Sequence, residues 1–195
     1  CEHGKGGIFR IQPSGGNYKV IYSFDENISH PWFSKNLATD GEWLYGGVDE
    51  GGLNGSGFFF RILPDGTNYS IIHHFGGTGN GINAVGQPVV YEGKLFFISG
   101  EGGPENAGQL LKMNTDGTNL TVMRNFSFER PSPSNWYAGL SIDGSRIYGT
   151  SNFGGKHNMG TLFSINANGS GFKLNYEFGD FPNDGTYPGS SEIVK

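Results

Sequence analysis

The chain has 195 residues, which is enough for one domain with a hydrophobic core. Charged residues make up only 16% of it and aromatic residues 14%, a composition that argues against a disordered chain. The net charge of −5 offers no basic face for phosphates, so we do not expect a nucleic-acid partner. No apolar run reaches the roughly 18–20 residues that span a bilayer, so no transmembrane segment is expected.

A segment of strand, turn and strand recurs four times along the chain. It starts at Phe9-Arg10-Ile11, and its copies start at Phe60, Leu111 and Phe163, which lie 51, 51 and 52 residues further on in turn. Each copy ends in a phenylalanine: Phe24, Phe75, Phe126 and Phe178. We expect both sets of apolar residues to be buried between neighbouring units, because each recurs at one phase of the repeat.

A second element lies between these copies. It reads Leu44-Tyr45-Gly46, and it recurs as Leu95-Phe96-Phe97 and Ile147-Tyr148-Gly149. An acidic residue and a glycine precede each copy, and a pair of glycines follows it. Asp-Gly between two apolar runs predicts a hairpin, because glycine accepts the positive φ of such turns. Each unit therefore contains four short antiparallel strands.

The predicted fold class is all-β: a β-propeller with blades of about 50 residues. Four repeats form either a four-bladed ring or part of a larger propeller, and a two-sheet sandwich is the alternative. The blades are expected at 31–75, 86–126 and 135–178, with a split blade from 187–195 plus 1–24. Strands are expected near 7–12, 18–24, 43–48, 58–63, 69–75, 94–99, 109–114, 120–126, 146–151, 161–166 and 172–178.

Cys1, the one cysteine, stands where the repeat predicts the second glycine of a pair. No internal disulfide can form. A lipid anchor of the bacterial lipoprotein type is one interpretation of a cysteine at this position. The other, which we favour, is excision from a longer array, because the strand that should precede this glycine pair is missing.

The units resemble the GloVer tandem repeat of secreted or surface-anchored bacterial and archaeal proteins. The likeness is densest around Ile147-Tyr148-Gly149-Thr150, Gly154-Gly155 and Gly160-Thr161-Leu162-Phe163. The resemblance implies a propeller-like fold and an extracellular or cell-envelope location, and it carries no catalytic residue and no ligand. Phe97 departs from the pattern, because it replaces a glycine of the second element.

A binding site is expected on the face formed by the connectors between blades and by the glycine-pair loops. These segments vary in length and content, whereas the turns of the opposite face are short and uniform. Blade packing is the alternative role for the two tryptophans among the candidates. The candidate ligand-binding residues are Trp32, Trp136, Tyr137, Glu50, Glu101 and His157.

No cofactor is predicted. Asp180 and Asp184 could hold calcium, but no calcium-loop motif surrounds them, so solvated loop carboxylates are the better interpretation. The sequence also contains no nucleophile elbow, zinc-protease motif or phosphate loop. We therefore expect a non-catalytic extracellular binding or scaffold module, with a glycan or another surface protein as its partner. The alternatives are a glycan-acting hydrolase or lyase and a purely structural spacer in a longer surface protein.

Overall fold

The computed structural model describes residues 6–24, 37–76, 82–129, 132–134 and 139–189. Every regular element in these ranges is a β-strand, and no helix that could cross a membrane occurs among them. The strands are β1 (Gly7–Arg10), β2 (Lys19–Ser23), β3 (Ala38–Thr39), β4 (Leu44–Val48), β5 (Phe58–Ile62), β6 (Ser70–His74), β7 (Ile82–Tyr91), β8 (Lys94–Glu101), β9 (Gln109–Asn114), β10 (Thr121–Asn125), β11 (Pro133–Ser134), β12 (Leu140–Asp143), β13 (Arg146–Ser151), β14 (Phe153–Gly154), β15 (Thr161–Asn166) and β16 (Lys173–Glu177).

The strands form three four-stranded antiparallel sheets and two two-stranded ones. We call the large sheets the β3–β6 sheet, the β7–β10 sheet and the β12–β16 sheet, the last of which has the order β12-β13-β15-β16. The first repeat contributes the β1–β2 hairpin, and β11 pairs with β14. The prediction of all-β, four-stranded units is confirmed for three repeats. Every strand predicted from the repeat is present, within two residues of its expected ends.

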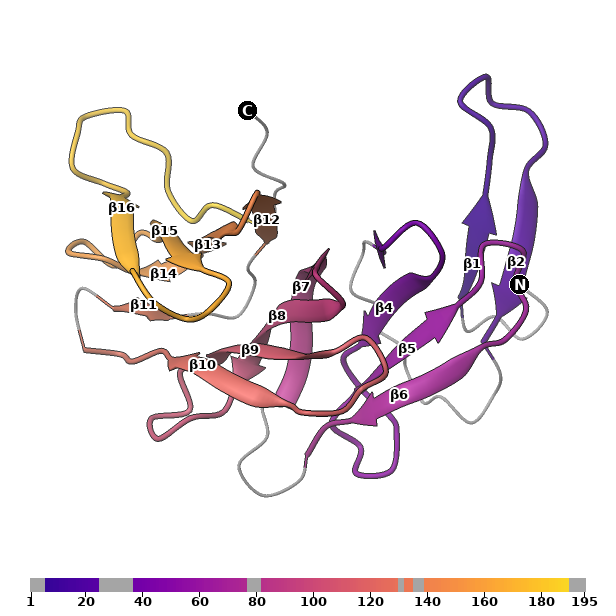
Figure 1. The fold of residues 1–195 in the computed structure, drawn as a ribbon. Coiled ribbons are helices and arrows are strands. Elements are labelled where there is room, and N and C mark those ends of the chain that lie inside the picture. Colours follow the sequence, from indigo (N-terminus) through magenta and orange to yellow (C-terminus); the bar gives the residue numbers. More distant parts are fainter. Residues whose placement is uncertain (1–5, 25–36, 77–81, 130–131, 135–138, 190–195) are drawn as a thin grey trace.

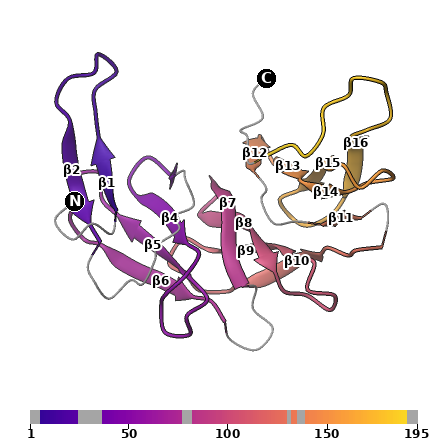
Figure 2. The same ribbon diagram turned by 180° about the vertical axis from the view of Figure 1, so that it is seen from behind.

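The sheets follow one another along an open arc (Figure 1). The β1–β2 hairpin lies at one end of this arc and the β12–β16 sheet at the other, and Figure 2 shows the same order from behind. Three hydrophobic clusters fill the junctions between consecutive units. The sandwich alternative is therefore wrong, and the described residues do not form a closed four-bladed ring.

The predicted split blade is described only in part. The β1–β2 hairpin pairs with no further strand among the described residues. Of the segment 187–195, residues 187–189 are described, and they lie against the β12–β16 sheet, where the Tyr187 amide donates a 2.8 Å hydrogen bond to the Met159 carbonyl. The pairing expected for the rest of this segment stays a prediction.

Glycines in the second strand of a unit make room for a phenylalanine on the third strand. Gly46 is paired with Phe60, and Gly149 with Phe163. A Cβ on Gly46 would lie 2.7 Å from Phe60 Cε1, which is closer than real Cβ contacts. In the third repeat the large ring is on the second strand instead, because Phe97 replaces the glycine and the smaller Leu111 lies opposite it. The departure of Phe97 from the repeat is therefore a cross-strand exchange of volume that keeps the core filled.

Eight apolar residues, two in each repeat, were expected to be buried. Six of them are buried, and the two at the ends of the arc are not. Phe9 is 58% exposed, and Phe178 is only half-buried. Each third-strand residue packs on the fourth strand of the preceding unit, as Phe60 does on Phe24 at 5.7 Å between ring centroids. Phe9 lacks a preceding unit and Phe178 a following one among the described residues. The six buried residues are Phe24, Phe60, Phe75, Leu111, Phe126 and Phe163.

Candidate functional site

The structure describes three of the six predicted ligand-binding residues. Trp32, Trp136 and Tyr137 lie outside the described residues. Glu50 is exposed beside the first glycine pair, Glu101 ends β8, and His157 follows the third glycine pair. These three residues lie at the end of a strand or in a loop of three different repeats, and no hydrogen bond or ion pair joins them to one another in the described part of the chain.

His157 is engaged by a neighbouring loop of its own repeat. Its Nε2 atom lies 2.8 Å from Asp180 Oδ1, and Lys156 Nζ lies 3.4 Å from the same oxygen. The hydrogen bond with His157 lowers the pKa of the Asp180 carboxyl, and the charge of Lys156 contributes to the same shift. Asp184 accepts hydrogen bonds from Tyr176 Oη and from the Gly179 amide. Within the described ranges no group of three or more His, Cys, Asp or Glu residues could hold a metal ion.

The glycine-pair loops share one backbone design. In each, the amide of a later glycine donates to the carbonyl of the first glycine of the pair, at 3.0, 3.2 and 3.3 Å in the three repeats. Asn106 and Asn158 occupy equivalent places with φ near 55–58°, and their side chains accept from the amides of Gly102 and Gly154. The three glycine-pair loops therefore repeat one backbone, which asparagine and glycine hold in left-handed conformations, while the side chains that they carry differ.

Asp49 is the most perturbed acid of this face. Its carboxyl is half-buried, and Oδ1 has no hydrogen-bond partner among the described residues. Burial raises the pKa of Asp49 to about 7, and the neighbouring charge of Glu50 adds to the rise. A carboxyl in this state gives up its proton near neutral pH. Nothing in the sequence distinguishes it from the other acids of the loop face, because burial is set by how the loops pack.

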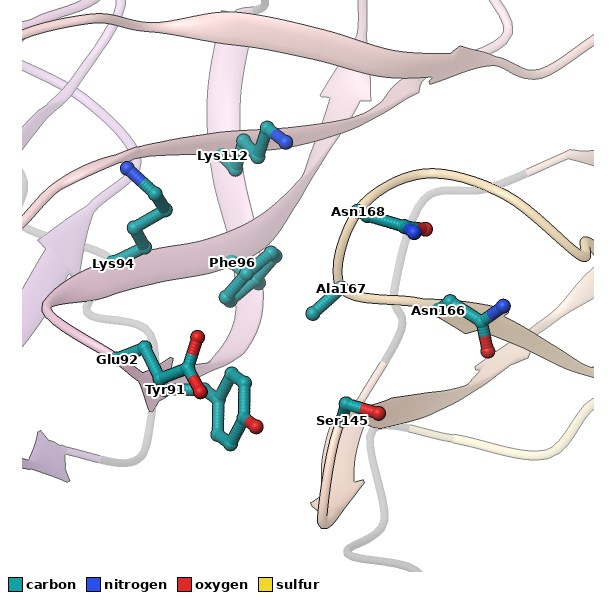
Figure 3. A pocket seen from close by; sticks show the side chains of 9 residues that line it. All are labelled: Tyr91, Glu92, Lys94, Phe96, Lys112, Ser145, Asn166, Ala167 and Asn168. Atoms are coloured by element: carbon teal, nitrogen blue, oxygen red, sulfur yellow. The ribbon is translucent and has the colours of Figure 1, made fainter.

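A groove of about 560 Å³ lies on the opposite face, between the β7–β10 and β12–β16 sheets (Figure 3). The first sheet contributes the β7–β8 turn and the facing positions on β8 and β9, and the second contributes two of its tight turns. The face of the tight turns, which the repeat pattern predicts to be uniform and where no binding site is expected, therefore carries a groove. The groove is lined by Tyr91, Glu92, Lys94, Phe96, Lys112, Ser145, Asn166, Ala167 and Asn168.

The groove opens because one turn does not close on its neighbour. In the second and third repeats, the turn glycines Gly66 and Gly117 lie so close to the preceding sheet that a Cβ on either would clash with a backbone carbonyl, at Ile21 and Ile72 respectively. The equivalent Gly169 has open space where its Cβ would be. The Gly169 turn therefore does not make the backbone contact with β10 that the two other turns make with their neighbours. Arg124 of β10 lies over the Phe172 ring beside this turn, and the hydrophobic cluster between the two sheets stays buried.

A change of side chains accompanies the gap. At the junction between the β3–β6 and β7–β10 sheets, Trp43 lies under the guanidinium of Arg61, 4.4 Å from its Cζ atom. One repeat later these positions are Lys94 and Lys112. Lys94 does not lie under a neighbouring cation as Trp43 does; it donates from Nζ to Asn114 Oδ1 at 2.9 Å, and it lines the groove. The substitution is visible in the aligned repeats, but its consequence depends on the geometry of the junction.

The lining combines cationic, amide and aromatic groups. Lys94 and Lys112 stand on one wall, with the Asn166 and Asn168 amides across from them in Figure 3. A hydrogen bond to the Glu92 carboxylate raises the pKa of the Tyr91 hydroxyl, so this hydroxyl stays protonated at neutral pH. Glu92 and Gly93 form the tight turn beneath it, with φ of 48° and 68°, which is the two-residue hairpin turn that suits the twist of its strands.

Repeated four-stranded meanders packed face to face along an arc define a protein of the β-propeller type. A family model described as the Gloeobacter/Verrucomicrobia repeat matches residues 1–195. The chain belongs to this family, which confirms the resemblance seen in the motifs.

Solved structures with the same fold are distant in sequence. A putative TolB from Agrobacterium tumefaciens is 13% identical, with a TM-score of 0.62 over 97% of this chain and 61% of that one. A nidogen/laminin complex is 12% identical, with a TM-score of 0.56 over 82% of this chain and 52% of that one. An oligogalacturonate lyase in complex with manganese is 14% identical, with a TM-score of 0.58 over 87% of this chain and 47% of that one. The chain thus spans less than two thirds of each, and the likeness shows the fold alone. No curated protein matches this chain.

Proposed function

We propose that this protein is a non-catalytic binding module of the cell exterior, and that its groove between the β7–β10 and β12–β16 sheets binds an acidic, hydroxyl-rich ligand such as a uronate-containing glycan. The observation that carries the proposal is that the turn at Gly169 leaves this junction open, whereas the turn glycines of the two preceding junctions contact the neighbouring sheet. The extracellular location rests on the family resemblance.

The chemistry of the lining supports a ligand of this class. Two lysines at Lys94 and Lys112 supply positive charge in a chain whose net charge is −5. Ammonium groups attract carboxylates, and hydrogen bonds to a charged group contribute about 1.5–3 kcal/mol each. The Oδ1 atoms of Asn166 and Asn168 accept hydrogen bonds from Arg146 and Ser170, so these amides offer N–H donors rather than acceptors to a ligand. The half-buried ring of Tyr91 offers apolar surface to a sugar face, whereas Phe96 is buried in the core.

Binding is better supported than cleavage. Glycoside hydrolysis ordinarily requires two carboxyl groups on either side of the scissile bond. Among the described residues that line the groove, Glu92 is the single carboxylic acid. It is hydrogen-bonded to Tyr91 within its own sheet. The spacer alternative predicts a smooth face and is not favoured by a groove of this size.

The direct test is calorimetric titration with a short galacturonate oligomer, a probe suggested by the name of one structural neighbour. The matched neutral oligosaccharide is the ligand control. Lys112→Gln should weaken binding by about 10- to 100-fold, since one charge-assisted contact is lost. Lys94→Trp should abolish binding without loss of stability, because it places in the groove the indole that Trp43 supplies at the preceding junction. Lys173→Gln, an exposed lysine of β16 outside the groove, is the matched control.

Added salt should weaken the wild-type interaction, because exposed charges are screened. Equal affinity for the acidic and neutral oligomers would refute the assignment of ligand charge. An affinity that Lys94→Trp leaves unchanged would refute the groove as the site.

A further inference from the structure

The tight turn between the third and fourth strands of a unit carries an acid in two repeats and an amide in the next. Asp65, Asp116 and Asn168 occupy the same place in the repeat, 51 and 52 residues apart. In each turn the Oδ1 atom accepts hydrogen bonds from the amide and the hydroxyl of the residue two places on, at 2.9 Å and at 2.6–2.7 Å. The three turns share one geometry, so Asn168 differs from the two aspartates in charge rather than in conformation.

Each of the two aspartates acts together with an arginine of the preceding unit. Hydrogen bonds within the turn lower the pKa of Asp65, and the charge of Arg10 on β1 adds to the lowering. Hydrogen bonds within its own turn likewise lower the pKa of Asp116, and the charge of Arg61 on β5 adds to it. At both of these junctions, the turn of one unit therefore places a negative charge near the cation that the third strand of its neighbour carries.

The junction between the β7–β10 and β12–β16 sheets keeps the cations and lacks the acid. Lys112 on β9 stands where Arg10 and Arg61 stand in the earlier repeats. Arg124 on β10 pairs with Leu110, which lies two residues from Lys112, so both cations project from one face of the sheet. None of the residues that the opposite sheet contributes to the groove is acidic.

Arg124 has no charged partner among the described residues. Its guanidinium lies over the Phe172 ring, with Cζ 3.6 Å from the ring centroid. Its Nε atom is buried without a hydrogen-bond partner in the described part of the chain, and burial lowers the pKa of the guanidinium. Arg61, by contrast, donates from Nε to Ser70 Oγ at 3.4 Å. Because a partly desolvated cation without a counter-charge is unfavourable, this arrangement favours the binding of an anion.

The amide of Asn168 is oriented to assist such an anion. Ser170 donates both of its hydrogen bonds to Oδ1, so the remaining atom of the amide is Nδ2, an N–H donor. The earlier turns present a carboxylate oxygen at this place. Asn168 faces Lys112 across the groove in Figure 3, and the Gly169 turn beside it makes no backbone contact with the neighbouring sheet.

We propose that a carboxylate group of the ligand takes the place of the absent aspartate, held by Lys112 and the Asn168 amide with Arg124 beside them, and that Asn168 is the residue that selects acidic ligands. This inference rests on the proposed function of the groove. An aspartate at this position would neutralise the cations from within the protein and repel the ligand. The amide leaves the cations without a counter-charge and donates a hydrogen bond to the same carboxylate.

The direct test is Asn168→Asp, which the turn accepts because Asp65 and Asp116 make the same hydrogen bonds in equivalent turns. In calorimetric titration this variant should bind a short galacturonate oligomer about 10- to 100-fold more weakly than the wild type, since an attractive contact becomes repulsive. Its affinity for the matched neutral oligosaccharide should not change. Asn119→Asp, which adds the same charge to an exposed turn outside the groove, is the matched control.

Arg124→Tyr tests the second cation. A tyrosine fits this place, because the equivalent Tyr22 stacks on Tyr69 at 4.2 Å between ring centroids. The variant should weaken binding of the acidic oligomer by about tenfold, since one ionic partner is lost, and leave the neutral one unaffected. Arg10→Gln removes the same charge from an exposed arginine far from the groove, and should leave both affinities as they are.

A second measurement requires no ligand. Asn168→Asp should raise the Tm at low salt, because the introduced carboxylate is attracted by Lys112 and Arg124, and added salt should remove this gain. Asn119→Asp should not raise the Tm in this way. Circular dichroism of each variant checks that it is folded.

The outcomes separate this inference from the proposed function. A galacturonate affinity that Lys112→Gln lowers but Asn168→Asp leaves unchanged overturns this inference alone. An equal loss of affinity in Asn119→Asp, or the absence of a Tm gain in Asn168→Asp at low salt, also overturns it. A wild type that binds no galacturonate oligomer overturns both.

Discussion

The exchange of volume between paired strands can be tested by rebuilding the third-repeat arrangement in the fourth repeat. Gly149 lies opposite Phe163, and a Cβ on this glycine would stand 2.8 Å from Phe163 Cε1 and 2.9 Å from Leu140 Cδ2. Gly149→Ala should therefore destabilise the fold by about 1–3 kcal/mol, which is the range for overpacking a core. Phe163→Leu alone should also destabilise it, because it leaves a cavity in a fully buried position.

The double variant should cost less than the sum of the two single changes. Leucine removes the ring that the new methyl group would strike, as Leu111 does opposite Phe97. We expect a coupling free energy of about 1–2 kcal/mol, measured by urea unfolding of the four proteins of the cycle. Gly16→Ala is the control, because its nearest neighbour is an ordinary 3.7 Å from the added Cβ. Additive effects, or a Gly149→Ala variant as stable as the wild type, would refute the packing explanation.

Three further predictions follow from the ends of the arc and from the loop face. Phe60→Ala should cost about 3–5 kcal/mol in urea unfolding, whereas Phe9→Ala should cost less than about 1 kcal/mol because Phe9 is largely exposed; equal losses would contradict the observed burial. Burial raises the pKa of Asp49 to about 7 in the fold. The stability that its protonated form contributes is therefore full below pH 3.8, the ordinary pKa, and is lost as the pH rises through 7. The Tm of the wild type should accordingly fall relative to that of Asp49→Asn between pH 4 and 8, and parallel profiles would count against the shift. Finally, His157→Ala should raise the pKa of Asp180 toward its ordinary value in an NMR titration, because the hydrogen bond that lowers it is gone; an unchanged titration would show that another group holds it down.

Strand positions were predictable because they depend on local pattern. A period of about 51 residues, two-residue alternation and glycine turns place every expected strand within two residues of its observed ends. The same reasoning treated Phe9 and Phe60 as equivalent, and their local conformations are equivalent, down to the angle between each ring and its tyrosine neighbour. Their burial differs, because burial depends on the adjacent unit rather than on the residue's own repeat.

The candidate site shows the same division. The replacement of Trp43 by Lys94 can be found by aligning the repeats, and it marks a change of chemistry at one junction. That a groove opens there was not predictable, since it depends on how far the Gly169 turn stands from the neighbouring sheet. Sequence reasoning placed variety in the loops and uniformity in the turns. The glycine-pair loops repeat one backbone while their side chains differ, and the strand ends beside the tight turns also vary between repeats.

The sequence by itself determined the strands, the turns and the family of this protein, because each rests on residues close together in the chain and repeated four times. Only the tertiary structure decided that the described repeats form an open arc, that the junction between the β7–β10 and β12–β16 sheets contains a groove, and that the rings at the two ends of the arc are exposed. These features depend on contacts between whole sheets, and small differences in how one sheet packs on the next are not encoded in any single repeat.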